Sequence, residues 1–391
     1  MEKLWNSDFV KLNIANFLLF FSFYMLTPLL PIYLNVEFGA GKHTIGAVLA
    51  GYTIVALIAR PLSGFIVDSF PRKKVLLTVY ALFALFFGCY LIAGSLFVFT
   101  VVRTLHGAPF GATTVANSTM AVDSLPARRR SEGIGYYGLS NNIASAFAPS
   151  VAIYIYELTQ DFNILFFVAL VSACAGWLVN STLKVKGVQV IREKRKLSAG
   201  SFFLMKGWRD GIVVMLLAFS YGVISTYLAI YGKEELGVTE GTGMYFLLLS
   251  LGLMASRLIG SRSLARGRIV KNACGGMLFS LVGYFVFAAV HNMAGYYASA
   301  IIIGLGNGHM YPAMQNIFIN LALPSQRGIA NASILTSWDA GIGLGVLLGG
   351  AIAETLGYHA AFWTAAIGNM IGVVFFLIYA RKTYIASTDI K

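Results

Sequence analysis

The sequence predicts an all-α membrane protein: twelve transmembrane helices arranged as two pseudo-symmetric six-helix bundles, with both termini in the cytoplasm. Of its 391 residues, 58% are hydrophobic and only 12% are charged, and the mean hydropathy is +0.74. A soluble globular chain carries about 25% charged residues. A soluble enzyme of this size could not hide so much apolar surface from water, and intrinsic disorder is excluded for the same reason.

The apolar stretches set the number of spans. A membrane-spanning helix needs about 20 apolar residues, and 391 residues allow about 33 for each of twelve spans with its connection. The stretches are continuous, whereas the strands of a transmembrane barrel would alternate apolar and polar residues. The predicted spans are 9–34, 44–67, 75–94, 96–122, 133–156, 163–183, 211–231, 242–262, 271–290, 295–321, 329–353 and 361–380.

The basic residues predict the orientation, because cytoplasmic loops of membrane proteins are enriched in Lys and Arg. Of the 29 basic residues, 25 fall on the side that holds both termini and the longest loop, and the opposite side has only Lys42 and Lys233. Arg60 and Arg103 lie inside spans. This distribution places the termini and the longest loop in the cytoplasm, and it explains the net charge of +13 without a nucleic-acid partner. The compact loops indicate a multi-pass protein of the cell inner membrane.

The longest connection divides the chain into two halves. We expect an N-terminal six-helix bundle at 1–183, a cytoplasmic linker at 184–210 and a C-terminal six-helix bundle at 211–391. The linker begins with basic residues and ends with an apolar group at 202–208. That group is compatible with a helix lying along the bilayer interface, or with an ordinary linker.

The two halves look duplicated. Gly107 and Gly111 recur as Gly304 and Gly308 at an offset of 197 residues, and other matches lie within one residue of that offset: Gly64 with Gly260, Leu125-Pro126 with Leu323-Pro324, and Glu157 with Glu354. Parallel six-helix repeats are a transporter architecture in which the binding site lies between the halves.

Ionisable residues inside the membrane are costly and therefore candidates for function. Asp339 lies about ten residues, or about 15 Å, into its span, which places it near the bilayer midplane. Its surroundings favour the protonated acid, so Asp339 is the main proton-coupling candidate; its alternative role is a hydrogen bond that fixes helix packing. His309, at comparable depth, and Arg103 are the other two candidates. His106 follows Arg103 on the same helical face.

Neutral polar and aromatic side chains recur on otherwise apolar spans. Around a cavity, they would suit an organic solute with apolar and hydrogen-bonding parts. The alternative is that they hydrogen-bond neighbouring helices. The predicted substrate-binding residues are Asn13, Asn16, Tyr24, Thr113, Asn117, Asn141, Tyr221, Tyr227, Asn307, Tyr311, Gln315 and Trp338.

The turn between the second and third spans carries an acid followed by three bases. Asp68 ends one span, and Arg72, Lys73 and Lys74 begin the next. Asp68 can pair with Arg72, pair with a base of the 128–130 run, or bind the positive N-terminus of the eleventh span. Such contacts would exist only in one conformation, so we predict a conformational latch at Gly64, Asp68, Arg72 and Lys73. The alternative is a positive-inside loop with one incidental acid.

This turn resembles the signature loop of the major facilitator superfamily, in which Gly-x-x-x-Asp-Arg-x-Gly-Arg-Arg/Lys follows span 2. Gly64, Asp68, Arg72 and Lys73 match it, while Ser69 and Pro71 replace a base and a glycine. In the second half, Leu264 takes the place of the acid. Arg103 with Gly107 resembles the family's span 4 motif, whose Arg is implicated in proton coupling.

Further similarities point to bacterial arabinose-efflux-like permeases. They are Pro28-Leu-Leu-Pro31, the segment 132–138, and the segment 338–345 that contains Asp339. The segment 138–149 resembles the span 5 motif of the family's drug–proton antiporters, but it matches poorly, because Phe147 and Ala148 replace glycines. The resemblance covers essentially the whole chain and implies transport without naming a substrate.

Together these features predict a proton-coupled transporter that exports a small organic solute, a drug or a metabolite, by alternating access. The alternatives are a proton-coupled uptake symporter and a uniporter. An intramembrane enzyme is disfavoured, because the five histidines are scattered and no His-Glu-x-x-His sequence occurs. The expected partners are the solute, protons and the lipid bilayer. We expect no nucleic acid, no cofactor and no metal ion, and a monomer.

Overall fold

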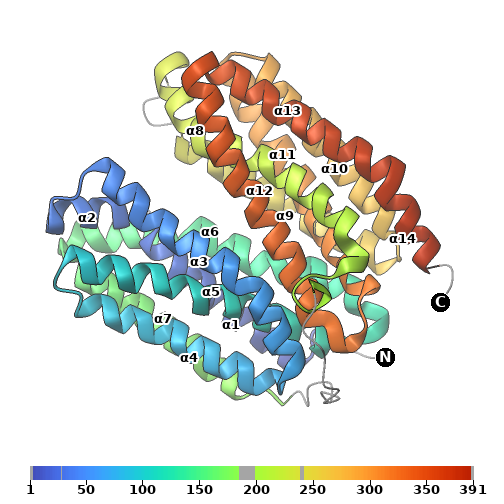
Figure 1. The fold of residues 1–391 in the computed structure, drawn as a ribbon, viewed down its shortest axis with the longest axis horizontal. Coiled ribbons are helices and arrows are strands. Elements are labelled where there is room, and N and C mark those ends of the chain that lie inside the picture. The colour runs from blue at the N-terminus through green and yellow to red at the C-terminus, as the bar shows by residue number, and fades with distance from the viewer. Residues whose placement is uncertain (1–2, 28, 185–198, 238–241, 389–391) are drawn as a thin grey trace. The chain divides into compact units, whose positions relative to one another are not determined.

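The computed structural model describes residues 3–27, 29–184, 199–237 and 242–388, and these residues are almost entirely helical (Figure 1). Nine of the described helices combine the length and the apolar composition needed to cross a membrane. Three more, α5, α6 and α11, are as long but carry more polar residues. The prediction of an all-α membrane protein is confirmed at this level, while the number of spans and the side of the termini stay predictions.

The described residues form two compact units. Unit 1 contains residues 1–127, 139–202 and 324–332, and unit 2 contains 128–138, 203–323 and 333–391. The helices wholly in unit 1 are α1 (Ser7–Leu26), α2 (Leu30–Phe38), α3 (Lys42–Ser69), α4 (Arg72–Leu91), α5 (Leu96–Ser124) and α7 (Phe162–Ser181). Those wholly in unit 2 are α8 (Trp208–Glu235), α9 (Thr242–Ala265), α10 (Ile269–Ala289), α11 (Met293–Leu321), α13 (Tyr358–Phe375) and α14 (Arg381–Thr388).

Two long helices are divided between the units. The first turns of α6 (Arg130–Thr159) belong to unit 2 and the rest to unit 1, whereas α12 (Arg327–Leu356) is divided in the opposite sense. A short 3-10 turn precedes each of them, at Ala127–Arg129 and Pro324–Gln326. The two turns, like the two helices, are offset by 197 residues.

The internal duplication is visible in how the helices pair. In unit 1, α3 packs on α5, α1 on α7, and α4 on both α5 and α7; in unit 2, α9 packs on α11, α8 on α13, and α10 on both α11 and α13. The helices α5 and α11 each have 29 residues and begin after a capping side chain, Ser95 or Asn292, at the same offset of 197. Each cap accepts a hydrogen bond from an amide three residues on, which satisfies one of the orphan amides of the helix end.

The glycines that the sequence pairs between the halves pack in the same way. A Cβ on Gly107 would collide with the carbonyl of Tyr52, and a Cβ on Gly304 with that of Leu249. Tyr52 and Leu249 are themselves 197 residues apart. Small residues let helix backbones approach this closely in membranes, so the repeat is built into the α3–α5 and α9–α11 contacts.

The first predicted span is wrong in one respect, because the apolar stretch 9–34 does not form one helix. Helix α1 ends at Leu26 and a separate helix, α2, begins at Leu30. Pro31 lies in the first turn of α2, where its missing N–H costs no hydrogen bond. Pro28 lies outside the described residues.

The end of the predicted linker packs onto helices of the units. Residues 185–198 lie outside the described part of the chain, and the following residues form two 3-10 turns, at Ala199–Ser201 and Met205–Gly207. Phe202 lies 5.8 Å from Phe65 between ring centroids in unit 1. In unit 2, the amide of Leu204 donates a hydrogen bond to the Ser333 hydroxyl at 2.8 Å.

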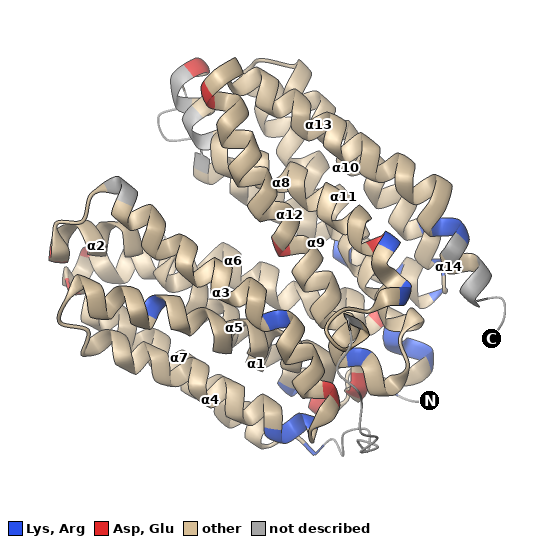
Figure 2. Cartoon of the chain, viewed as in Figure 1, with Lys and Arg blue, Asp and Glu red and all other residues tan. Residues whose placement is uncertain are grey.

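Charged side chains are concentrated at one end of unit 1. Figure 2 shows them gathered where α3 passes into α4, whereas most of the length of its helices is uncharged. An apolar helix length with charges at the ends suits a bilayer, where charges inside the hydrocarbon region are expensive.

Candidate functional site

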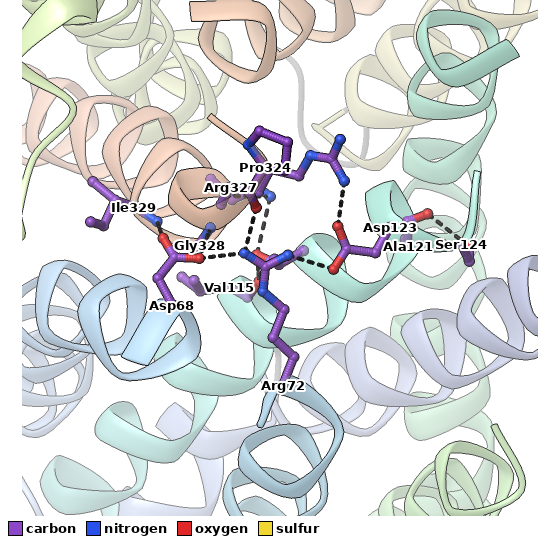
Figure 3. A network of polar contacts seen from close by, with 12 residues as sticks. Asp68, Arg72, Val115, Ala121, Asp123, Ser124, Pro324, Arg327, Gly328 and Ile329 are labelled. Carbon is purple, nitrogen blue, oxygen red and sulfur yellow. Dashed lines mark hydrogen bonds and ion pairs between the residues drawn. The ribbon is translucent and has the colours of Figure 1, made fainter. Parts of the chain in front are cut away.

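A buried ionic network joins α3, α4, α5 and the first turn of α12 within unit 1 (Figure 3). We call it the Asp68 network; its members are the side chains of Asp68, Arg72, Asp123 and Arg327 and the backbone of Pro324, Gly328 and Ile329. Two acids and two bases make it neutral overall. The Asp68 and Arg72 side chains are 0% and 2% exposed, so this is an interior site.

The Asp68 carboxylate binds the N-terminus of α12. The amide of Gly328 donates to its Oδ1 at 2.9 Å, and the amide of Ile329 donates to its Oδ2 at 2.8 Å. The first amides of a helix have no partner within the helix and carry the positive end of its dipole. An acid from α3 therefore caps the start of α12.

Arg72 links this cap to a second acid. Its guanidinium donates to Asp68 at 2.6 Å, to Asp123 at 2.5 Å and to the carbonyl of Pro324 at 2.8 Å. The other oxygen of Asp123 accepts from Arg327 at 2.6 Å. A planar guanidinium suits several acceptors at fixed directions, which a lysine ammonium does not.

Close packing brings α12 within reach of Asp68. A Cβ on Gly64 would lie 2.6 Å from the Cβ of Ala332 and 3.0 Å from the carbonyl oxygen of Gly328, so only glycine fits here without a shift. Asn331 adds a second attachment, because its amide donates to the Thr119 hydroxyl at 3.2 Å and accepts from Ser118 at 3.1 Å.

Two of the three contacts predicted for Asp68 occur, those with Arg72 and with the helix N-terminus. The third is not among the contacts of Asp68 within the described residues, and Arg129 of the 128–130 run pairs with Glu132 at 2.8 Å. Lys73 lies outside the network, and its ammonium donates to the carbonyl of Leu183 at 2.6 Å. Sequence reasoning missed Asp123 and Arg327, which look like an ordinary acid and base at span ends.

Arg103 lies in a second buried site in unit 1, among aromatic rings. Its guanidinium carbon stands 3.9 Å above the centre of the Tyr52 ring, and one of its nitrogens donates to the Tyr90 hydroxyl at 3.3 Å. The Tyr90 hydroxyl lies 2.7 Å from Nδ1 of His106. The sequence singled out Arg103 and His106 but gave no sign of the two tyrosines.

The predicted substrate residues of α1, α5 and α6 lie in unit 1, and two of them bond to each other. The Asn117 amide donates to Asn16 at 3.4 Å, and the Asn16 amide donates to Ser140 at 2.8 Å. Asn180 of α7 extends this chain by donating to Asn117 at 3.2 Å. Such bonds hold helices together, which was the alternative interpretation of these residues.

The other predicted residues of unit 1 are placed separately. The Asn13 amide and the Thr113 hydroxyl donate to carbonyls of their own helices, at 2.8 and 2.6 Å. Tyr24 stacks on Phe20, with ring centroids 5.9 Å apart. Asn141 is half-buried on α6.

In unit 2, three of the predicted residues form an aromatic group. Trp338 of α12 lies 5.8 Å from Tyr221 of α8 and 5.2 Å from Tyr311 of α11, between ring centroids. Asp339 follows Trp338 and is half-buried. This group is the densest set of predicted substrate residues in either unit.

The remaining predicted residues of unit 2 lie on three helices. Tyr227 donates to the carbonyl of Val346 at 2.7 Å, and Asn307 accepts from Ser280 at 3.2 Å. Gln315 is buried on α11, and His309 is half-buried, with Nδ1 3.0 Å from the carbonyl oxygen of Leu305.

One basic residue that was counted with the cytoplasmic segments is buried within a helix. Arg257 lies inside α9 and is only 7% exposed. A Cβ on Gly138, in the first turns of α6, would fall on its guanidinium. Arg257 therefore belongs with Arg60 and Arg103 as an arginine buried along a helix.

Comparisons with known proteins agree with this architecture. The sequence model of the Major Facilitator Superfamily matches residues 12–322 and 276–389. The staphylopine export protein of Staphylococcus aureus is 24% identical, with 96% of each chain aligned. The multi-drug resistance efflux pump PmrA of Streptococcus pneumoniae is 22% identical over 96% of this chain and 97% of its own.

Solved structures show the same fold. The transporter FucP, in the outward conformation, superimposes with a TM-score of 0.80 at 16% identity, covering 94% of this chain and 97% of its own. The human organic anion transporter MFSD10 gives a TM-score of 0.78 at 13% identity, covering 94% and 98%. The chain belongs to the Major Facilitator Superfamily, and it is a multi-pass membrane transporter rather than an enzyme.

Proposed function

We propose that this transporter exports a small organic solute in exchange for protons, working by alternating access. In this proposal it is a monomer with twelve spans in the cell inner membrane and has both termini in the cytoplasm. The observation that carries the proposal is the Asp68 network. It holds the first turns of α12 in unit 1, although the rest of that helix belongs to unit 2.

The network acts as the cytoplasmic latch. Opening the cytoplasmic side requires the start of α12 to leave Asp68, which exposes two helix amides and a carboxylate at once. Hydrogen bonds to charged groups contribute about 1.5–3 kcal/mol each, so the latched state is favoured until ligand or proton binding offsets this energy. Gly64, Asp68 and Arg72 form the latch, with Asp123 and Arg327 completing it, and Lys73 anchors the end of α7 beside it.

Proton coupling is assigned to Asp339, with Arg103 and His309 as the other proton-coupling residues. Asp339 is a half-buried acid well inside α12, and it follows Trp338 of the aromatic group that Tyr221 and Tyr311 complete. If a solute stacked on these rings also reaches the acid, binding of one ligand changes the affinity for the other. Coupling needs such a difference, because equal affinity for two states shifts no population.

Export is the direction that the relatives favour. The names of two relatives describe export or efflux, and that of another, from Planococcus maritimus, describes an antiporter of monovalent cations and protons. A proton driven by the membrane potential supplies about 2.3 kcal/mol per 100 mV. Exchange with protons would therefore drive a solute out against its gradient.

The test uses purified protein in liposomes. A thermal-shift screen against drugs and metabolites at two pH values first identifies a ligand, and its labelled form is then followed across the membrane under an imposed pH gradient. We expect accumulation that stops when an ionophore collapses the gradient and that is lost in Asp339→Asn. The matched control is Asp161→Asn, a half-buried acid that caps α7. Transport indifferent to both the gradient and Asp339→Asn would refute the proposal.

A second candidate, an uptake symporter or a uniporter, is supported by one relative. The maltose permease of Geobacillus stearothermophilus is 27% identical over 95% of both chains. The same liposomes separate the candidates. In a symporter, solute moves in the same direction as protons; in an antiporter, it moves against them; and in a uniporter, the pH gradient has no effect.

A further inference from the structure

Four buried polar side chains meet in unit 1 at the packed faces of α3, α4 and α5. They are Tyr52, Tyr90, Arg103 and His106, which are 3%, 1%, 4% and 1% exposed. The rings of Phe83, Phe86 and Phe87 surround the His106 imidazole, with centroids 4.8–5.2 Å away. The group is thus a polar cluster enclosed by aromatic rings.

The hydrogen bonds in this cluster start from Arg103. A guanidinium has donors only, so the Arg103 nitrogen donates to the Tyr90 oxygen at 3.3 Å. The Tyr90 hydroxyl keeps its own hydrogen for a further acceptor, and Nδ1 of His106 lies 2.7 Å away. In the neutral tautomer with its hydrogen on Nε2, His106 accepts that hydrogen at Nδ1.

The cluster contains one positive charge and no acid. Within the described residues, Arg103 makes no ion pair, and the face of the Tyr52 ring is its only other close polar partner. Its Nε, Nε2 of His106 and the Tyr52 hydroxyl all lack a partner in hydrogen-bonding geometry. A second positive charge beside Arg103 would be strongly disfavoured in so apolar a place.

From this geometry we infer that His106 is a second proton-binding residue, controlled by Arg103 through Tyr90. While Arg103 donates to Tyr90, Nδ1 of His106 is occupied by the tyrosine hydrogen and no proton binds. When the guanidinium leaves Tyr90, a proton from water bonds to Nδ1, and the resulting N–H donates to the Tyr90 oxygen. One N–H bond forms on His106 and one O–H bond of a hydronium ion breaks, which leaves water. The imidazolium then replaces the guanidinium as the single positive charge of the cluster.

This inference rests on the proposed proton coupling and adds a residue to it. Arg103 would move when it meets an anionic group or when α5 shifts against α4, and His106 would take up a proton in compensation. The charged or titratable groups facing His106 are Tyr52 from α3, Tyr90 from α4 and Arg103 from its own helix.

The test is NMR of the purified full-length protein with isotope-labelled histidine, from about pH 8 to about pH 5. The chain has five histidines, and the His106→Gln variant identifies the His106 signal by its loss. In the wild type, and in the Arg103→Lys control that retains the charge, we expect His106 to stay the neutral Nε2–H form throughout. In Arg103→Gln and Arg103→Met, its proton affinity should rise on the order of 100-fold.

The outcomes are decisive in both directions. A His106 signal that titrates in the wild type, or that stays neutral in both uncharged variants, overturns the inference. Two variants are included because one of them could fail to fold, which thermal unfolding would reveal. The measurement needs no solute: if His106 behaves as expected while transport ignores a pH gradient, the proposed function fails and the Arg103–His106 relationship stands.

Discussion

Asp68 and Gly328 lie 260 residues apart in the chain, and the amide of Gly328 donates a hydrogen bond of 2.9 Å to the Asp68 carboxylate. The acid ends one helix and the amide begins another, so the bond joins two helix ends rather than two helix faces. Because the carboxylate also binds Ile329 and Arg72, its removal should loosen the whole start of α12.

Asp68→Asn should increase the rate at which the start of α12 separates from α3. Ala330, which is fully buried on α12, is replaced by cysteine in a background without the three native cysteines, and its reaction with a maleimide is timed. A loss of about 2 kcal/mol from charged hydrogen bonds corresponds to about a 30-fold faster labelling. Asp161→Asn, whose carboxylate caps α7 away from the Asp68 network, is the control and should leave the rate unchanged. Equal rates in the two variants would contradict the assignment of Asp68.

Arg72→Lys should destabilise the protein even though the charge is kept. The guanidinium contacts Asp68, Asp123 and the Pro324 carbonyl, and an ammonium cannot reach all three in the same directions. Leaving part of a buried ion network unpaired costs about 3 kcal/mol, which should appear as a lower midpoint of thermal unfolding in detergent. Arg129→Lys, in a half-exposed pair with Glu132, should have little effect. If both variants unfold at comparable temperatures, Arg72 contributes only its positive charge and the direction of its hydrogen bonds does not matter.

Gly64→Ala should separate α3 from α12, because the added methyl would lie 2.6 Å from the Cβ of Ala332. Gly88→Ala is the matched control on α4, since its methyl would come no closer than 4.0 Å to Leu170 and should stabilise the helix by about 0.5–1 kcal/mol. The two variants should therefore shift the unfolding midpoint in opposite directions. Stabilisation by Gly64→Ala would show that α12 does not pack here as described.

The duplicated glycines should respond alike. In Gly107→Ala the methyl would collide with the Tyr52 carbonyl, and in Gly304→Ala with the Leu249 carbonyl, both of which are backbone atoms that cannot easily move. We expect both variants to lose several kcal/mol of stability, as in other overpacked interiors. Gly275→Ala in α10, which meets no atom within 4 Å, serves as the control for thermal unfolding. A severe effect at only one of the two sites would argue against equivalent packing in the halves.

Most of the architecture could be predicted because it depends on local composition. Apolar runs gave the long helices within a few residues, and the spacing of Gly107 and Gly304 gave the repeat. The break between α1 and α2 lies inside the predicted span 9–34, because Leu29 and Leu30 continue the apolar run and hydropathy does not detect where one helix ends and the next begins.

The Asp68 network was only partly predictable, because the residues that bind Asp68 and Arg72 are distant in sequence and come together only in the tertiary fold. Asp68 stands in a recognisable turn, but Asp123 and Arg327 are 204 residues apart and neither has a local signal. The tyrosines beside Arg103 are two among twenty in the chain. Asn16 and Asn117 have the chemistry of a binding site and also of a helix contact, and composition alone does not choose between them.

The division of α6 and α12 between the two units has a consequence for dissecting the molecule. Cutting the gene in the linker would yield two fragments. The N-terminal fragment would lack the first turns of α12, which belong to unit 1, and the C-terminal fragment would lack the first turns of α6, which belong to unit 2. The N-terminal fragment would retain Asp68 and Arg72 without the helix end that they bind. The two fragments should therefore fold only when they are produced together in one cell, because each supplies a segment that completes the other's unit.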